Sequence, residues 1–530
     1  MFDLSQAVLT GTTALADWLI VLPVVMALLG AAVALMLQRA PGAAAGLALL
    51  VVAAIIACDV MLLLRVLESG PASMTMGRWL PPFGISFAVD VFSASFALAA
   101  AVVTLIVLVY SLGERAEDGF HPLVLLLLAG VSGAFLTGDL FNLYVWFEVM
   151  LIASFGLMVL GGRPLQLDGA VKYGVLNFLA TSFFLAALGL LYGTLGTLNM
   201  ADVIGRAPGA NPVAITAIAA LMLLAFGMKA AVFPLNAWLP ASYHTPPAVV
   251  SALLAGLLTK VGAYAMLRVL VMVLPAAREQ LDWVLASIAI ATLIVGPLGA
   301  IAETNLRRAI GFIVIGGIGA ILAGIAMPSL HGIGGAGLYI VHAMLTLTAL
   351  YLAAGLIERL TGQTDSRLMG GLYATHAPVS ILFFVLILAV AGVPPFLGFW
   401  PKLLLLEGGM GDADLRGAGV AGVDWLSLAI VVALLINAVL TLIAGTRLWA
   451  HIFWREGREG EHSEQRAAPL QPLSRRERWF GFGAVTILTL LIVALGLWPD
   501  WLFQAALMGA GDMLDPAGYI AAVGLAGGGP

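Results

Sequence analysis

The chain has 530 residues, of which 62% are hydrophobic and only 10% are charged, and its mean hydropathy is +1.07. Soluble domains carry about 25% charged residues, so this composition excludes a soluble protein and predicts one that lies in a membrane throughout. The formal net charge of -5 adds little, because the positions of charges matter in a membrane protein. Cys58 is the single cysteine, and without a Cys/His cluster the sequence predicts no metal site, no cofactor and no redox chemistry.

Apolar runs of about 20 residues, the length that crosses a bilayer as a helix, follow one another along the chain between short polar breaks. We count about fourteen such runs and therefore predict an all-α polytopic membrane protein. The predicted spans are residues 17–37, 43–64, 88–111, 121–137, 140–160, 171–194, 212–240, 247–274, 282–302, 306–327, 333–357, 375–408, 426–452 and 479–499.

These spans predict a division of the chain into five parts. Residues 1–120 are expected to hold the first three helices, 121–274 a five-helix repeat and 275–453 a second, inverted five-helix repeat. Residues 454–478 form a predicted cytoplasmic loop, and residues 479–530 form the last helix and an extracytoplasmic tail.

The basic residues predict the orientation, because they favour cytoplasmic loops. When the polar breaks are taken alternately, fifteen Lys and Arg lie in one set and six in the other, which includes Arg268 and Arg416. We therefore expect a multi-pass protein of the cell (inner) membrane with both termini outside the cytoplasm.

Glu148, Lys229, Lys260 and Lys402 are ionisable residues that lie inside the apolar runs. An ionisable side chain at the depth of a bilayer costs roughly 2.5 to 3.5 kcal/mol on insertion scales, so such a residue usually lines a hydrated path or pairs with another charge. These residues therefore predict ion movement through the membrane.

Two of the lysines lie beside prolines that interrupt their helices. Lys229 and Pro234 occur in FGMKAAVFPLNAWLP, and Lys402 follows Pro394 and Pro395 in AGVPPFLGFWPKLLLL, five spans later. A proline leaves backbone carbonyls without partners, and a membrane accepts such a break only inside protein or beside a hydrated cavity. An odd separation of five spans turns the second unit over, so the sequence predicts two inverted repeats, each with a proline-broken helix.

Three segments resemble one known family. They are GDLFNLYVWFEVMLIASFGLMVLGG, GMKAAVFPLNAWLPASYHTPPAVVSALLAGLLTKVGAYAMLR and AGVPPFLGFWPKLLLLEGG. Together they resemble the proton-translocating membrane subunits of the NADH dehydrogenase and Mrp antiporter superfamily over about residues 80 to 455. Within it, NLYVWFEV and RLWAHIFWRE are most similar to the D subunit of multisubunit Na+/H+ (Mrp-type) antiporters.

The resemblance implies a proton relay along the membrane midplane. It implies that Glu148 pairs with Lys229, that Lys260 continues the relay, and that Lys402 ends the row. Burial disfavours a charged lysine and pairing favours it, so separating such a pair would free a proton. Lysine suits this role better than arginine, which does not release its proton readily.

Other polar residues surround the predicted relay. The resemblance implies that His342 feeds its centre, but Thr346 and Gly316 stand where some relatives place ionisable residues, so the central water path is left open. His244, Thr346 and Thr348 are the candidate proton-uptake or hydration groups. For His244, a role as a turn residue without a part in proton uptake is an equal alternative.

The sequence thus predicts a secondary antiporter subunit rather than an enzyme. Its partners would be the other subunits of a cation/proton antiporter complex and membrane lipid, with H+ and Na+ moved by the whole complex and no nucleic acid bound. The alternative is a proton-pumping membrane subunit of a respiratory NADH:quinone oxidoreductase or membrane hydrogenase-type complex. A structural scaffold is the third reading, but it leaves the cost of buried lysines unexplained. The exchanged cation stays open.

Overall fold

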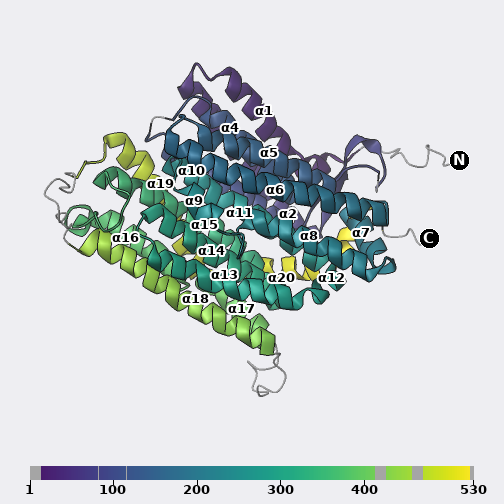
Figure 1. Cartoon of the computed structure of the whole chain (residues 1–530). Helices are drawn as coiled ribbons and strands as arrows, with labels where there is room; N and C mark the ends of the chain where they lie inside the picture. The colour runs from purple at the N-terminus through teal and green to yellow at the C-terminus, as the bar shows by residue number, and fades with distance from the viewer. Residues whose placement is uncertain (1–12, 82, 115, 412–424, 456–469, 526–530) are drawn as a thin grey trace.

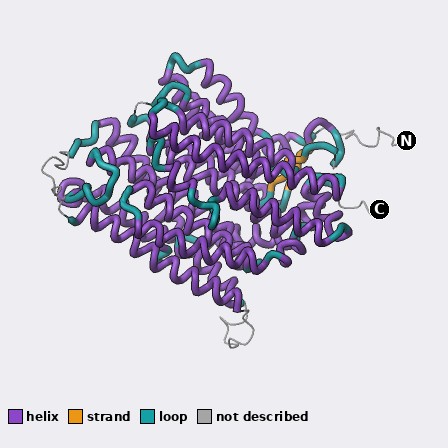
Figure 2. Tube along the Cα trace, viewed as in Figure 1, coloured by secondary structure: helices purple, strands orange, loops and turns teal. Residues whose placement is uncertain are grey.

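The computed structural model describes residues 13–81, 83–114, 116–411, 425–455 and 470–525 (Figure 1). Most of these residues are helical, and the helices run alongside one another in one bundle (Figure 2). The strands are β1 (Ala72–Thr75) and β2 (Ser86–Val89), which form an antiparallel hairpin with Ala72 opposite Val89 at one end of the bundle.

The helices of the first half include the segment that carries Lys260. In chain order they are η2 (Leu15–Ile20), α1 (Leu22–Met36), α2 (Pro41–Ser69), η3 (Met76–Arg78), α3 (Val91–Ser111), α4 (Phe120–Leu136), α5 (Leu140–Val159), α6 (Pro164–Leu195), α7 (Met200–Arg206), η4 (Ala207–Gly209), α8 (Pro212–Ala230), α9 (Trp238–Tyr243), α10 (Ala248–Leu253), η5 (Leu254–Leu258), α11 (Thr259–Leu267) and η6 (Arg268–Val273). The last four are continuous and form one span over Ala248–Val273.

The helices of the second half begin at Pro275. Its helices are α12 (Pro275–Gln280), α13 (Asp282–Ala302), α14 (Leu306–Ala326), α15 (Leu330–Thr361), α16 (Leu372–Ala391), α17 (Phe399–Met410), α18 (Trp425–Trp449), η9 (Ala450–Trp454), η10 (Glu477–Phe482), α19 (Gly483–Leu497), α20 (Asp500–Leu514) and α21 (Ala517–Val523). Several helices of the chain begin after a side chain that accepts a hydrogen bond from the first free N–H groups, as Asp90, Asp139 and Asn305 do.

The polytopic helical fold is confirmed. Twelve helices in the described part of the chain are long and apolar enough to cross a membrane, and α1 and α4 are shorter apolar helices. Each falls on one of the predicted spans, while the number of crossings and the inverted repeat stay predictions. The hairpin is a departure from the predicted all-α structure, and it lies between two spans, where polar backbone needs partners of its own.

α15 lies at the centre of the bundle. It packs against α3, α10, α14, α16, α17, α19 and α20, and its side chains are almost all buried (Figure 1). Because α15 carries no charge between its first and last turns, the polar groups that it brings to the centre are His342 and hydroxyl groups, among them Thr346 and Thr348.

The segment predicted as an extracytoplasmic tail contains two further helices, α20 and α21. α20 packs against α3 and α15 through a face of small residues. A Cβ built on Gly509 would lie 2.6 Å from the ring of Phe92, so this close approach requires glycine. Within the predicted loop, residues 456–469 lie outside the described residues. Arg416, which lies in an earlier polar break, is also outside them. The Gln471 N–H donates to the Leu360 carbonyl at 2.9 Å, which docks this part of the chain on α15.

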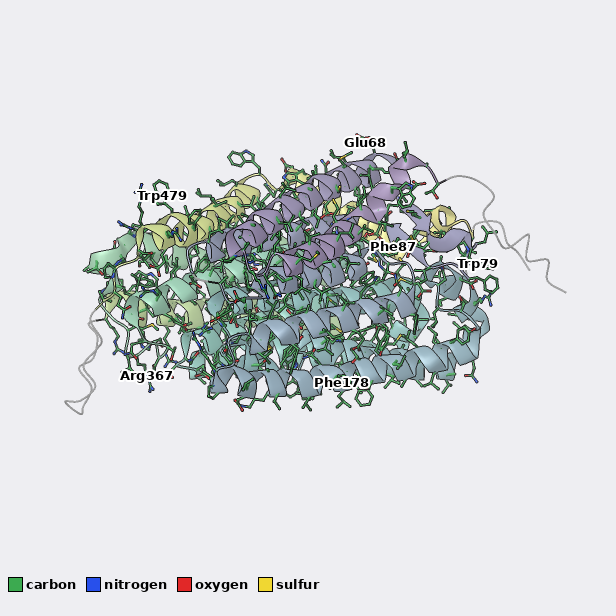
Figure 3. All side chains as sticks on the ribbon, turned by 90° about the horizontal axis from the view of Figure 1, so that it is seen from above. Glu68, Trp79, Phe87, Phe178, Arg367 and Trp479 are labelled. Carbon is green, nitrogen blue, oxygen red and sulfur yellow. The ribbon has the colours of Figure 1, made fainter. Side chains whose placement is uncertain are left out.

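Both described chain ends pack against the same end of the bundle. Near the amino-terminal end, Asp17 forms an ion pair with Arg65 at 2.7 Å, and near the carboxyl-terminal end the Ala522 carbonyl accepts from the Ser73 hydroxyl of β1 at 2.6 Å. Figure 3 shows Glu68 and Trp79 at this end, opposite Arg367 and Trp479. The two described ends therefore lie at the same end of the bundle, and the side of the membrane that this end faces stays a prediction.

Candidate functional site

The helix that carries Lys229 ends one residue after it. α8 ends at Ala230, and Ala231 then has a φ of 62°, in the left-handed region that non-glycine residues rarely adopt. The indole N–H of Trp238 donates to the Met228 carbonyl at 2.9 Å and so satisfies a carbonyl that the break exposes. Pro234 lies in the segment between α8 and α9, where the chain has already left the helix.

The amine of Lys229 lies beside a small internal cavity. The side chain is 8% exposed, and its nitrogen lies 4.8 Å from the centre of the Phe147 ring. The cavity measures about 20 Å³, which is enough for one water molecule. It is lined by Phe147, Met150, Leu151, Tyr173, Asn177, Lys229 and Leu258.

Glu148 lies on a different face of α5 from Phe147. It is half-buried and lines a groove of about 850 Å³ between α5 and α6, together with Phe178, which Figure 3 places at the periphery of the bundle. The ion pairs of the described residues do not include Glu148 with Lys229, although the charge of Glu148 acts on the Lys229 amine. The predicted pair would therefore require a movement of one of these side chains.

Lys260 is held by backbone within its own span. Its amine, which is fully buried, donates to the Ala255 carbonyl at 2.5 Å and to the Thr259 hydroxyl at 3.2 Å. Ala255 belongs to the π-helical segment η5, and such wide turns free carbonyls and often occur at functional sites. Thr348 of α15 packs against this segment, because a Cβ on Gly256 would lie 2.2 Å from the Thr348 hydroxyl.

Lys402 bridges the second broken helix. α16 ends at Ala391, Pro394 and Pro395 lie in the break, and α17 begins at Phe399. The Lys402 amine reaches back and donates to the Ala391 carbonyl at 2.7 Å and to the Val390 carbonyl at 3.3 Å. A lysine thus satisfies carbonyls at this break, whereas a tryptophan does so at the first.

The two lysines do not occupy matching places in their helices. Lys229 lies before its break, in the last turn of α8, and Lys402 lies after its break, in the first turns of α17. The similarity between the two sequence segments therefore predicted both helix breaks. It did not predict on which side of its break each lysine lies.

Gly392 provides the space for Lys402, which leads to a first prediction. Gly392 has a φ of 85°, and a Cβ there would lie 2.6 Å from the Lys402 side chain. Gly392→Ala should lose about 1–2 kcal/mol of stability from the backbone and should also displace Lys402 and reduce cation/proton exchange. Gly411→Ala is the matched control, because Gly411 has a φ of 79° but the described residues place no atom within 4 Å of the added methyl. Equal exchange by the two variants would contradict the prediction.

His342 lies between the surroundings of Lys260 and those of Lys402. Its Nδ1 lies 3.1 Å from the Thr346 hydroxyl, and its ring lies against Gly398 in the break before α17. Both Lys260 and Lys402 act electrostatically on His342, so these three groups lie in one neighbourhood. The helix of Lys260 also contacts that of Lys229, since a Cβ on Gly262 would lie 2.9 Å from the Ala230 nitrogen.

Gly316 lies where two helices touch and does not open toward the site. A Cβ on Gly296 of α13 would lie 2.4 Å from the Gly316 nitrogen, and a Cβ on Gly316 would lie 3.0 Å from the Asn437 side chain. The Asn437 amide donates to the Leu293 carbonyl at 2.7 Å and closes this contact. A histidine in place of Gly316 has no room here, so the central groups of this chain are His342 and its neighbouring hydroxyls.

His244 lies in the turn after α9. Its Nδ1 lies 2.8 Å from the Pro240 carbonyl oxygen, a bond that holds the turn. Burial lowers the pKa of His244, and the charges of Arg308 and Arg307 lower it further, while the Pro240 contact opposes them. The neutral form therefore prevails at neutral pH.

A buried ion pair escaped the sequence-based prediction. Arg268 was assigned to a loop, which is wrong: it lies inside the span Ala248–Val273, is 2% exposed and pairs with Asp90 before α3. The Tyr264 hydroxyl accepts from Arg268 at 2.9 Å and donates to the Phe135 carbonyl at 3.0 Å. Burial and the charge of Asp90 raise the pKa of nearby Asp512 to about 6. The sequence offered one signal for this pair, which was the basic residue Arg268 near the end of a predicted span. Its partner Asp90 lies 178 positions away in the chain, so the sequence did not reveal it.

Comparison with known proteins assigns the family. Residues 137–423 match the family described as NADH:quinone oxidoreductase/Mrp antiporter, TM. The chain belongs to this family of transmembrane subunits. It is 36% identical over 517 residues to the Na(+)/H(+) antiporter D subunit of Bacillus subtilis (strain 168), covering 95% of this chain and 99% of the relative. It is 35% identical to the corresponding D subunit of Alkalihalophilus pseudofirmus, over 92% of this chain and 94% of that one.

The solved structures agree with this assignment. The fold superposes on a chain of the Mrp complex from Dietzia sp. DQ12-45-1b with a TM-score of 0.87 at 30% identity, over 96% of this chain and all of that one. It also superposes on a chain of respiratory complex I from Thermus thermophilus with a TM-score of 0.77 at 21% identity, over 94% of this chain and all of that one, a likeness of fold alone.

Proposed function

We propose that the chain is the proton-translocating D-type subunit of a multisubunit Na+/H+ antiporter in the cell membrane. The two relatives compared above are Na(+)/H(+) antiporter D subunits that match over 99% and 94% of their length, which supports this function over that of a redox-driven pump subunit. Its partners would be the other subunits of such a complex, and both chain ends would face away from the cytoplasm. The coarser likeness to complex I supports only the shared fold.

One observation carries the proposal. Lys229 and Lys260 are buried on α8 and α11, which contact each other, and Lys402 is buried on α17, which packs against α15 as α11 does. None of the three lysines forms an ion pair among the described residues. Instead, Lys260 and Lys402 donate to carbonyls beside a π-helical segment and a broken helix. Ammonium groups without counter-ions are costly at this depth, so amines that gain and lose protons explain the arrangement better than fixed charges do.

The proposed row begins at Glu148 and Lys229, passes Lys260 and His342, and ends at Lys402. Pairing of Glu148 with Lys229 would follow a movement of the lysine from its cavity past Phe147. Because Lys260 and Lys402 both act electrostatically on His342, a proton gained at either amine changes the proton affinity of His342. Thr346 and Thr348 would complete the connections with water.

The proposed cargo of this subunit is H+, with the path for Na+ largely in a partner. The described residues contain no group of three or more His, Cys, Asp or Glu side chains that could hold a metal ion. A dehydrated Na+ needs several oxygen ligands, as other hard cations do. Sodium-dependent proton movement by the isolated chain in vesicles would contradict this division.

The function is tested by exchange in inverted vesicles that contain the whole complex. Glu148→Ala, Lys229→Ala and Lys402→Ala should each reduce cation/proton exchange by on the order of 100-fold, because each interrupts a proton transfer. Lys172→Ala is the control, since Lys172 is an exposed lysine paired with Asp168 on the surface of α6. If all three variants assemble and exchange at the rate of the unchanged protein, the chain acts as a scaffold.

A further inference from the structure

One face of α6 carries polar groups from an end of the bundle to the cavity of Lys229. Gly169, Tyr173 and Asn177 are spaced by four residues and therefore share a face, over about 12 Å of helix. At Gly169 the helix contacts the turn after α9, because a Cβ there would lie 2.0 Å from the Thr245 hydroxyl oxygen. Tyr173 and Asn177 line the cavity at the other end.

The Tyr173 hydroxyl forms a short hydrogen bond with the Ser154 hydroxyl of α5. Their oxygens lie 2.6 Å apart, both side chains are buried, and either group can be the donor. Ser154 can instead donate to the Leu151 carbonyl, which lies 3.0 Å away. The pair therefore has two arrangements: Tyr173 donates to Ser154, or Ser154 donates to Tyr173 and frees the phenol proton for the cavity.

The phenol of Tyr243 lies near that of Tyr173. Tyr243 ends α9 and is fully buried, and its hydroxyl has no hydrogen-bond partner among the described residues. It is close enough to Tyr173 for the two to interact electrostatically. A buried hydroxyl without a partner is rare in proteins and calls for an explanation such as a water molecule or a transferred proton.

The aromatic packing ties this line of hydroxyls to the break in α8. The ring centres of Tyr173 and Tyr243 lie 5.6 Å and 5.5 Å from that of Trp238, each edge to face. Trp238 in turn bonds the Met228 carbonyl beside Lys229. Any movement of the broken helix would therefore also move Tyr173 relative to the lysine.

We propose that Tyr243, Tyr173 and Ser154 carry protons between Lys229 and the end of the bundle where Thr245 lies; this rests on the proposed function. When the amine is neutral, the Tyr173 O–H proton passes to it through the water that the cavity admits. The phenol oxygen then takes the Ser154 proton, and the Ser154 oxygen takes a proton through water from the Tyr243 hydroxyl. Tyr243 recovers a proton from a hydronium ion at the end of the bundle where Thr245 lies. The hydroxyls end unchanged and one proton has moved. Reversing these steps takes a proton away from the lysine.

The inference is tested by Tyr173→Phe in the assembled complex, with exchange measured in inverted vesicles between pH 6 and 9. The ring and its packing on Trp238 remain, so only the hydroxyl is lost. Exchange should fall by about 10- to 100-fold, as for the loss of a proton-transfer group, and the solvent deuterium isotope effect on the remaining exchange should rise. Tyr192→Phe on the exposed face of the same helix should change neither quantity.

Ser154 provides an independent variant should Tyr173→Phe not assemble. Ser154→Ala removes the partner hydroxyl, whereas Ser154→Thr keeps it, so exchange should fall in the first and persist in the second. Unchanged exchange and an unchanged isotope effect in Tyr173→Phe, or in Ser154→Ala, would overturn the inference. If Lys229→Ala is inactive in the same vesicles, the proposed function survives that result, and if Lys229→Ala is active, the proposed function itself fails.

Discussion

Replacement of Lys402 by arginine is expected to leave the protein folded and to stop exchange. Arginine keeps the positive charge and can donate to the Val390 and Ala391 carbonyls, as Lys402 does. It does not release its proton at physiological pH, so the last group of the proposed row would become a fixed charge. Exchange in inverted vesicles should fall by on the order of 100-fold or more, with the amount of assembled complex unchanged.

Two further variants make this result decisive. Lys402→Met keeps the length of the side chain but removes the amine, and it should lose exchange as well. Lys172→Arg, at a lysine whose side chain is 49% exposed, should exchange normally. Full exchange by Lys402→Arg would show that proton release at this position is not required, and the row would then have to end elsewhere.

Loss of one partner of the Arg268–Asp90 pair is expected to be the most destabilising single change outside the proposed row. Both side chains are 2% exposed, so Arg268→Met would leave the Asp90 carboxylate buried without its counter-ion. Breaking a buried pair in this way costs roughly 3–5 kcal/mol. Thermal unfolding of the purified complex in detergent should show this as a lower transition temperature of this subunit.

A variant that replaces both residues of the pair separates the stability lost with the ion pair from the stability lost with the packing of the side chains. Arg268→Met combined with Asp90→Leu removes both charges and should recover much of the stability, because well-packed apolar residues often replace a buried pair at little cost. Lys172→Met breaks an exposed pair and should cost at most about 0.5 kcal/mol. An Arg268→Met protein as stable as the unchanged one would contradict the assignment.

The pair also predicts a sensitivity to acid. Burial opposes ionisation of Asp90, but the charge of Arg268 and the hydrogen bonds from Arg268 and Ser93 outweigh it and lower the pKa of Asp90 below its usual value. The stabilisation is therefore complete above the pKa of an unfolded aspartate and is lost as the pH falls through the lowered value. Arg268→Met should remove this part of the acid sensitivity.

The sequence alone predicted the parts of the fold that depend on local chemistry. Apolar runs located the spans because a bilayer requires each one to be long and uncharged. Pro234, Pro394 and Pro395 located the two breaks because a proline cannot continue the backbone hydrogen bonds of a helix. The lysines were recognised because charge at that depth is rare.

What the sequence did not predict depends on which face of each helix meets its neighbours. Glu148 and Phe147 are adjacent in sequence, yet Phe147 lies against the Lys229 amine and Glu148 lines the groove on α6. The Arg268–Asp90 pair joins residues 178 positions apart, and no local pattern encodes such a contact. The need for a glycine at position 316 likewise comes from a contact between helices, because Gly296 of α13 packs directly against Gly316.

The attachment of the two described chain ends at the same end of the bundle, one to α2 and the other to β1, has a practical consequence. Asp17 is tied to Arg65 and Ala522 to Ser73, so we predict that reporters fused to the two ends sample the same aqueous compartment. Fluorescent or enzymatic fusions at the two ends should give one shared answer about sidedness. A single accessible label on either terminus is then enough to determine how the whole bundle is inserted.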